Sequence, residues 1–483
     1  MTRVVSPREG LVTALVLLMG GCSGEFVSND NASDDVSGDA QAPPGPGEPD
    51  AQAPPPVDAG IPPVTEGTDD WTELGHDPGR SFASTDRVAP PLHTLWTWMV
   101  ASNPDLLYAA NAVSIDGKVR AHVAGNRQQE HQNSNSPYLQ SLDLATGADA
   151  GRWWTENAPI GIEFWYSATP KVTIITDDFC GAVDTMTHET AFICDEVINV
   201  CQLGDVIGET TVDLAGGRYY AINEQEFHMP GEFGPEYCIP PANLSAYTLT
   251  GGQRLWTANL SRYPTRTATS IAFAAGAVYA AVHVTNGPPV DGSPMPEDGV
   301  YSLDGASGAG RWFVPSSAQT SYRSLSTDGT RVHVAVSEGG SLKVAVLGAA
   351  DGHTLATSPA LGASRRALPP GRLGERLVVY TGDALYALER GTGAILWSVT
   401  GLDGDIGDGG SSFGRVLDNA YAISGDGTVY VTTKKAVRAY ALEDGSPVWT
   451  QDVSATLGKV GPPILARGRL LVVGEKAIVA LGP

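Results

Sequence analysis

Short runs in which apolar and polar residues alternate fill the chain from Trp71 onward, and Gly, Asp and Pro separate them. Examples are AVYAAVHV from Ala277, GTVYVTT from Gly427 and RLLVVG from Arg469. A period of two residues is typical of β-strands, and no long stretch has the 3.6-residue period of a helix. The pattern therefore predicts an all-β fold.

These strands recur in repeated units. LYALERGTGAILW occupies residues 385–397, and VRAYALEDGSPVW and LSAYTLTGGQRLW repeat its pattern at 437–449 and 244–256. Each unit consists of a strand, a Gly-containing turn and a second strand that ends in Trp. The second strands contain Trp96, Trp153, Trp256, Trp312, Trp397 and Trp449, and residues 353–359 hold the same place without a Trp.

The spacing of these second strands predicts the architecture. They follow one another at 57, 103, 56, 44, 41 and 52 residues. Because the 103-residue gap is about twice the others, we expect it to contain a degenerate unit between about Phe164 and Gly208. Four antiparallel strands in roughly 40–55 residues, repeated seven or eight times, are typical of a β-propeller. We predict eight four-stranded blades, with seven as the alternative.

The two ends of the repeat region predict how the ring closes. The strand around Trp96, residues 93–100, has no complete unit before it, and the last unit, GRLLVVGEKAIVALGP, ends without a Trp strand. We expect this N-terminal strand to complete the last blade, which leaves no open sheet edge. The repeated Trp residues are interpreted as structural, one aromatic ring per blade packed between neighbouring sheets. Gly391, Gly393 and Gly445 then permit positive φ in the turns.

The first 70 residues have a different composition. Arg3 and Arg8 precede an apolar run, residues 11–21, that is too short to span a membrane, and Cys22 follows it. This segment resembles a bacterial lipoprotein signal peptide (residues 1–21), which implies lipid attachment at Cys22 and, from Ser23, the outer membrane. The alternative is an ordinary cleaved signal. Residues 22–70 are rich in Pro, Asp and Ala, which predicts a disordered tether before the folded domain, residues 71–483.

Charge and cysteine content limit the possible partners and chemistry. The net charge is −24, so the chain should repel nucleic acid. The four remaining cysteines lie within 59 residues, and in an exported chain they predict two disulfides, with free thiols as the alternative. They contain no C-x-x-C pair, and no His stands at zinc-ligand spacing from them. These candidates are Cys180, Cys194, Cys201 and Cys238.

Other motifs are interpreted mainly as loops. GSSFG at 410–414 matches a nucleophile motif around Ser412, but an Asp/Gly loop precedes it and a strand-like run follows, where the motif needs a strand and then a helix. Asp403, Asp405 and Asp408 could bind Ca²⁺, although their spacing differs from that of an EF-hand, and a solvated loop is favoured. Residues 125–138 and 222–241 are candidate partner-binding loops.

The repeat YAL-(E/D)-x-x-(T)G-x-x-x-W resembles that of the pyrroloquinoline-quinone (PQQ)-like β-propellers, and WTELGHDPGRSFAS at 71–84 resembles their entry segment. That family includes quinoprotein dehydrogenases and non-enzymatic lipoproteins, among them the propeller subunit of the outer-membrane β-barrel assembly machine. The adjacent cysteines, the calcium-binding carboxylate and the catalytic Asp of the dehydrogenases have no counterparts that we can place here, and no C-x-x-C-H haem site occurs.

The resemblance therefore implies a non-catalytic binding or scaffold lipoprotein of the bacterial cell envelope. No cofactor is expected. Its partners would be envelope proteins, bound through the propeller loops, and the membrane, through the lipid on Cys22. The alternatives are a periplasmic quinoprotein-type oxidoreductase, which would need PQQ and Ca²⁺, and a surface propeller that binds glycans or peptides.

Overall fold

The structure is a computed structural model. It describes residues 67–73, 75–100, 107–125, 138–154, 165–168, 172–176, 180–184, 190–193, 206–224, 241–264, 267–284, 298–317, 319–363, 368–406 and 419–483. The predicted signal peptide, Cys22 and most of the tether lie outside these residues. The described part contains one helix, α1 (Ser454–Leu457), and none long and apolar enough to cross a membrane.

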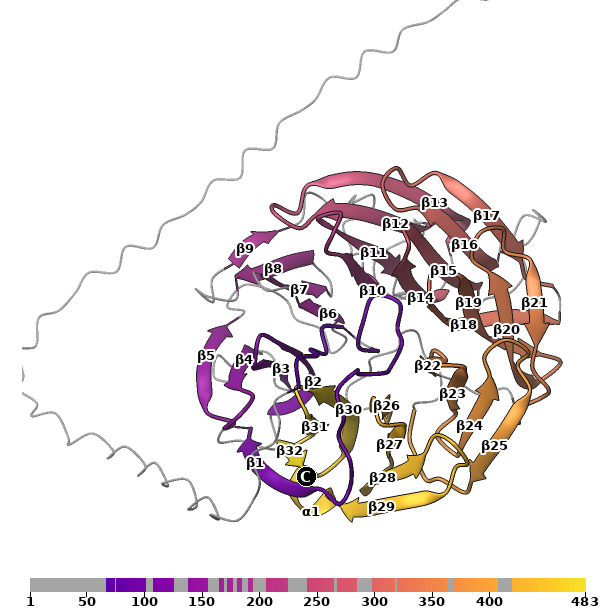
Figure 1. The fold of residues 1–483 in the computed structure, drawn as a ribbon. Coiled ribbons are helices and arrows are strands. Elements are labelled where there is room, and N and C mark those ends of the chain that lie inside the picture. Colours follow the sequence, from indigo (N-terminus) through magenta and orange to yellow (C-terminus); the bar gives the residue numbers. More distant parts are fainter. Residues whose placement is uncertain are drawn as a thin grey trace, which may run out of the picture. The chain divides into compact units, whose positions relative to one another are not determined.

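The described residues form eight four-stranded antiparallel sheets arranged as a ring of blades (Figure 1). In chain order the strands of blades 1 to 4 are β2 (Leu107–Ile115), β3 (Lys118–Gly125), β4 (Tyr138–Asp143), β5 (Asp149–Trp154); β6 (Trp165–Ala168), β7 (Val172–Thr176), β8 (Cys180–Asp184), β9 (Thr190–Ile193); β10 (Val206–Asp213), β11 (Arg218–Glu224), β12 (Pro241–Thr248), β13 (Arg254–Pro264); β14 (Thr267–Ala274), β15 (Ala277–Val284), β16 (Gly299–Asp304), β17 (Gly310–Pro315).

The strands of blades 5 to 8 are β18 (Thr320–Thr327), β19 (Arg331–Glu338), β20 (Ser341–Gly348), β21 (Thr354–Thr357); β22 (Gly371–Leu373), β23 (Arg376–Tyr380), β24 (Ala384–Glu389), β25 (Ile395–Thr400); β26 (Tyr421–Ile423), β27 (Thr428–Thr432), β28 (Ala436–Ala441), β29 (Pro447–Asp452); and β30 (Val460–Ala466), β31 (Arg469–Gly474), β32 (Ala477–Gly482) with β1 (His93–Met99).

Three sequence predictions are confirmed by this arrangement. The blades number eight, and the degenerate unit exists as blade 2, which begins at Trp165. The ring closes as expected, because β1 pairs antiparallel with β32, with His93 opposite Gly482 and Trp98 opposite Ile478. One blade is thus built from both ends of the domain, and its sheet holds them together.

A β-bulge explains why the repeated phrase reads x-Leu-Trp. In blade 6, Ile395 pairs with Leu388 and Trp397 with Ala387, so Leu396 is skipped. The outermost strand of each of the eight described blades skips one residue at this place: Leu95, Ala150, Ala191, Leu255, Arg311, Leu355, Leu396 or Val448. A bulge bends an edge strand and makes it a poor template for pairing with another chain.

Four of the repeated Trp residues connect their blade to the next one. The indole N–H of Trp397 donates to the Leu442 carbonyl oxygen at 2.8 Å, and its ring covers Gly445. A Cβ on Gly445, which has φ 74°, would lie 2.7 Å from that ring. The same contact joins Trp96 to Leu144 and Gly147, Trp256 to Gly305 and Gly308, and Trp312 to Ala349 and Gly352.

The strand register corrects part of the predicted Trp set. Gly151, not Trp153, takes the equivalent position in blade 1, because it pairs with Ser141, and Trp153 lies two residues further along β5. Phe192 takes that position in blade 2 and Ala356 in blade 5. Trp449 packs against the core, but blade 8 has no turn to receive it, because its last two strands, β32 and β1, are not consecutive in the chain.

Candidate functional site

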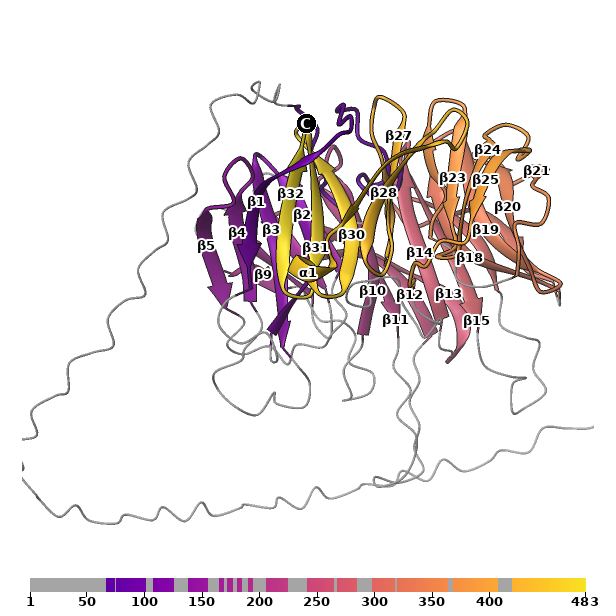
Figure 2. The same ribbon diagram turned by 90° about the horizontal axis from the view of Figure 1, so that it is seen from below.

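A segment that precedes the first strand crosses the middle of the ring. We call residues 67–88 the axial segment, with Leu74 outside the described residues. Figure 1 shows it in indigo across the ring axis, and Figure 2 shows it at the end of the ring where the C-terminus lies. It includes the entry segment noted in the sequence, and it begins within residues assigned to the tether.

The axial segment hydrogen-bonds to the inner parts of seven of the eight blades, counted over the described residues. The partners are Ser114, Val212, Phe273, Thr327, Arg372, Ile423 and Arg467 in blades 1, 3, 4, 5, 6, 7 and 8. Most of these contacts join backbone groups, and the bridge between Ala83 and Ile423 is parallel. The segment therefore supplies partners to inner strands that have no neighbouring strand on the axis side.

Arg80 belongs to the axial segment and is completely buried. Its Nε donates to the Ile271 carbonyl oxygen at 2.5 Å, and its Nη2 donates to the Thr210 carbonyl oxygen at 3.2 Å. One guanidinium thus joins blades 3 and 4. A buried charge is tolerated in proteins only when it is hydrogen-bonded in this way.

Glu73 is buried beside blade 3, where its Oε1 accepts a hydrogen bond from the Val212 N–H at 3.0 Å. Burial raises the pKa of Glu73 to about 8, although the nearby charge of Arg80 acts in the opposite direction. This carboxyl group is therefore mainly protonated at neutral pH.

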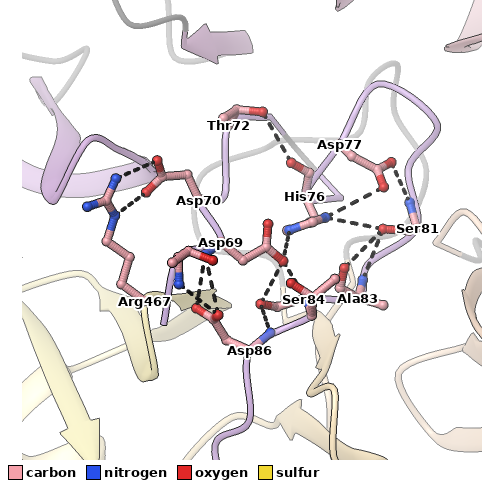
Figure 3. Close-up of polar contacts among 12 residues, drawn as sticks. Asp69, Asp70, Thr72, His76, Asp77, Ser81, Ala83, Ser84, Asp86 and Arg467 are labelled. Carbon is pink, nitrogen blue, oxygen red and sulfur yellow. Dashed lines mark hydrogen bonds and ion pairs between the residues drawn. The ribbon is translucent and has the colours of Figure 1, made fainter. Parts of the chain in front are cut away.

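His76 lies between two carboxylates (Figure 3). Its Nε2 is 3.0 Å from Asp69 Oδ2, and its Nδ1 is 3.6 Å from Asp77 Oδ2. Burial disfavours the imidazolium, but the hydrogen bond to Asp69 and the negative charges of Asp69 and Asp77 outweigh it and raise the pKa of His76 to about 9. Burial also acts against the charged form of Asp69, whereas His76 lowers the pKa of that carboxyl to about 2. The group is thus an ion pair at neutral pH.

The order Asp69–His76–Ser81 resembles a hydrolase triad, because His76 Nδ1 is also 3.3 Å from Ser81 Oγ. A triad histidine must be neutral to remove the proton of the serine. Here the imidazole is protonated at pH 7, and Ser81 Oγ is buried and bonded to both the N–H and the carbonyl oxygen of Ala83. The arrangement fixes the fold of the axial segment and does not activate a nucleophile.

A second group of contacts lies where the ring closes. Asp70 Oδ1 accepts a hydrogen bond from Arg467 Nε in blade 8 at 2.9 Å, and Asp70 Oδ2 accepts one from the Asp116 N–H in blade 1 at 2.9 Å (Figure 3 shows the Asp70–Arg467 pair). The Ser114 N–H donates to the Trp71 carbonyl oxygen at 2.7 Å. The axial segment therefore joins the first and last blades a second time, independently of β1.

Most residues of the sites predicted from sequence motifs lie outside the described part of the chain, so those predictions are not tested. Asp403 Oδ1 lies 3.5 Å from Arg438 Nη2, which competes with a cation, and the Asp405 N–H donates to Asn419. Asp408, Ser412, three of the cysteines and most of both candidate partner loops lie outside the described part, and only the backbone of Cys180 is described. Nowhere in that part do three His, Cys, Asp or Glu residues gather closely enough to hold a metal ion.

The end of the ring axis that the axial segment occupies has no room for a flat cofactor such as PQQ. Arg80, Phe82 and Tyr421 fill it with side chains that are at most 1% exposed, and the rings of Phe82 and Tyr421 stack at 4.7 Å. We therefore derive no chemical step through PQQ at this end of the ring.

The sequence profile of a family described as outer membrane protein assembly factor BamB matches residues 381–481. A search of curated protein sequences finds no match. BamB from Moraxella catarrhalis has a similar structure, with a TM-score of 0.51 and 13% identity over 81% of this chain and 100% of that one.

Two enzymes also share the fold. Quinohemoprotein alcohol dehydrogenase ADHIIG from Pseudomonas putida HK5 has a TM-score of 0.59 and 12% identity over 86% of this chain and 80% of that one. A europium-containing methanol dehydrogenase has a TM-score of 0.59 and 10% identity over 87% of this chain and 99% of that one. The chain is thus a β-propeller in fold and is similar to PQQ-like propellers, and identities this low carry no function.

Proposed function

We propose that this PQQ-like β-propeller is a non-catalytic binding or scaffold module of the bacterial cell envelope, anchored through a lipid on Cys22. The observation that carries the proposal is how the buried polar groups of the axis are used. His76 is held as an imidazolium between carboxylates, and Arg80 is bonded to backbone carbonyl groups. Groups engaged in this way hold the ring together and are poorly suited to acid–base chemistry.

The strand register supports a single binding surface, because both candidate partner loops leave the same end of the ring. Gly125 begins the first candidate partner loop and Glu224 lies near the start of the second, and they pair with Leu107 and Val206 at the starts of the inner strands β2 and β10. The axial segment contacts the opposite ends of these strands, at Ser114 and Val212. Both loops therefore start from the end of the ring that the axial segment leaves free, so one partner could contact both.

In-cell photo-cross-linking tests this proposal. A photoreactive amino acid is placed in turn within residues 126–137, within residues 225–240, and at Ser398, an exposed position on the outer strand β25. We expect the two loops to capture the same envelope protein and Ser398 to capture none. No captured protein, or equal capture from Ser398, would argue against a loop-bound partner.

Mass spectrometry of the membrane-extracted protein tests the anchor separately. We expect a diacylglyceryl modification on Cys22, and we expect Cys22→Ser to release the protein from the membrane fraction. An unmodified mature N-terminus at another residue would show an ordinary cleaved signal.

A PQQ-dependent oxidoreductase is the second candidate, and the likeness to the two dehydrogenases is the reason to test it. The purified protein is incubated with PQQ and Ca²⁺, and alcohol-dependent dye reduction is followed. Our proposal predicts no dye reduction above that of a heat-denatured sample, and sustained turnover would overturn it.

A further inference from the structure

The seam between blades 5 and 6 differs from the four seams that a Trp closes. Ala356 stands in β21 at the position where blades 3, 4, 6, 7 and 8 have a Trp. Gly393 of blade 6, the equivalent of Gly445, lies instead against the backbone of Ser358, whose nitrogen would be 3.1 Å from an added Cβ. The outer part of this seam thus lacks the indole that closes the others.

Charged side chains occupy the same seam nearer the axial segment. Arg390, which follows β24 in blade 6, places its Nη1 at 3.5 Å from Oδ2 of Asp328, which follows β18 in blade 5. The Nη2 of Arg390 also donates to Glu375 Oε1 at 2.9 Å. Arg372 lies close by and donates from Nη1 to the Gly79 carbonyl oxygen at 3.0 Å. Blades 5 and 6 are therefore joined by an ion pair and by the axial segment.

His333 is buried within this polar seam. It lies in β19, opposite Ser326 of β18, and its exposed fraction is 0%. Burial lowers the pKa of His333 to about 3; Asp328 opposes this shift, whereas Arg372 and Arg390 reinforce it. The imidazole is therefore neutral at pH 7, with one ring nitrogen that donates a hydrogen bond and one that accepts.

Four buried atoms of this seam have no hydrogen-bond partner among the described residues. They are both ring nitrogens of His333, Oδ2 of Asp328 and Nε of Arg390. Buried polar atoms in native proteins are nearly always hydrogen-bonded to protein or to ordered water. The set contains two donors, on His333 and Arg390, and two acceptors, on His333 and Asp328.

This balance of donors and acceptors selects the kind of ligand. A metal cation would meet two N–H groups and the positive charges of Arg372 and Arg390. An anion would meet the carboxylate of Asp328 and the lone pair of His333. Water can donate and accept at once, so water molecules can satisfy all four atoms.

We propose that the seam between blades 5 and 6 binds ordered internal water, which hydrogen-bonds to His333, Asp328 and Arg390 and bridges the two blades. These water molecules take part in closing a seam that lacks the Trp contact. The site is structural, and it stands whether or not the proposed envelope function is correct.

Magnetic relaxation dispersion of the ¹⁷O nucleus of water counts water molecules that remain inside a protein for longer than its tumbling time. We compare the native protein with His333→Leu, which removes both ring nitrogens, and with His353→Leu, which changes an exposed histidine outside the seam. We expect His333→Leu to lose at least one long-lived water and His353→Leu to lose none. An unchanged count in a folded His333→Leu variant would overturn the proposal.

A crystal structure supplies the second measurement and does not depend on His333→Leu folding. Solvent density within hydrogen-bonding distance of His333 and Asp328 is expected in the native protein. It is also expected in His333→Gln, whose amide retains a donor and an acceptor. Ring nitrogens bonded directly to protein atoms, or an ion in their place, would contradict the inference.

Discussion

The rim and the axis of this ring both join neighbouring blades, but they do so with different chemistry. At the rim, one contact is repeated, in which a Trp indole donates to a carbonyl oxygen and covers a Gly of the next blade. At the axis, one segment makes a different polar contact with each blade that it reaches. Single substitutions at the rim should therefore each lower the free energy of unfolding by a small amount, whereas one substitution at the axis should lower it by a large amount.

Arg80→Leu should have the largest effect. It leaves the carbonyl oxygens of Ile271 and Thr210 without their buried donor. A buried polar group that loses its hydrogen-bond partner costs about 1–3 kcal/mol, and two carbonyl groups are affected here. We expect the free energy of unfolding to fall by about 4 kcal/mol, measured by denaturant titration.

Arg311→Leu is the matched control at the rim. Arg311 forms an ion pair with Asp304 at 2.8 Å, but its side chain is 37% exposed. Exposed ion pairs contribute roughly 0–1 kcal/mol. A loss for Arg80→Leu no greater than that for Arg311→Leu would refute the distinction between axis and rim.

The ion pair of His76 should make the axis sensitive to alkaline pH. Its pKa of about 9 in the folded protein lies above the ordinary value of 6.5. The contribution of the charged imidazole is therefore complete below pH 6.5 and is lost as the pH rises through 9. The shift corresponds to about 3 kcal/mol, and His76→Gln should remove it.

The measurement for His76 is the stability difference between the native protein and His76→Gln at several pH values. This difference cancels the contribution of Glu73, which is present in both proteins. Because folding raises the pKa of Glu73 from 4.5 to about 8, this residue also makes the folded protein less stable as the pH rises from 4.5. We expect the difference to be largest near pH 6, to shrink as the pH rises from 6.5 to 9, and to be mostly lost above pH 9. A difference that does not depend on pH would show that His76 acts only through packing.

At the rim, Trp397→Ala should cost less. The indole is only partly buried, so its loss should cost about 2 kcal/mol, below the range of about 3–5 kcal/mol for a fully buried Trp. Trp397→Phe keeps a ring over Gly445 but removes the donor to Leu442, and should cost about 1 kcal/mol. Thermal unfolding of both variants checks this order, and equal losses would mean that the hydrogen bond carries the whole contact.

The same contrast explains how much the sequence could predict. The rim repeats, so blade number, ring closure and the structural role of Trp397 could be inferred from spacing alone. Trp153 was misplaced because the prediction followed the Trp itself. Counting four residues from the turn glycine Gly147, as from Gly393 to Trp397, gives Gly151, the residue that the register places there. The roles of His76 and Arg80 occur once in the chain, and their partners lie up to 191 residues away. Only the density of polar residues just before the first strand could have indicated them.

The smallest predicted effect is a gain in stability from a substitution at the seam between blades 5 and 6. Ala356→Trp places an indole at the position that pairs with Val346, as Trp397 pairs with Ala387 in blade 6. By analogy with the other seams, its N–H should reach the carbonyl oxygen of Arg390, three residues before Gly393. The new burial is offset in part by displacing the backbone at Ser358, so we expect stability to rise by about 1 kcal/mol. Gly393→Ala in the same variant should cancel the gain, because the added methyl group would occupy the place of the indole. If Ala356→Trp destabilises the protein even with Gly393 intact, then the Trp–Gly contact is not transferable, and blade 5 lacks it because its strand follows a different path.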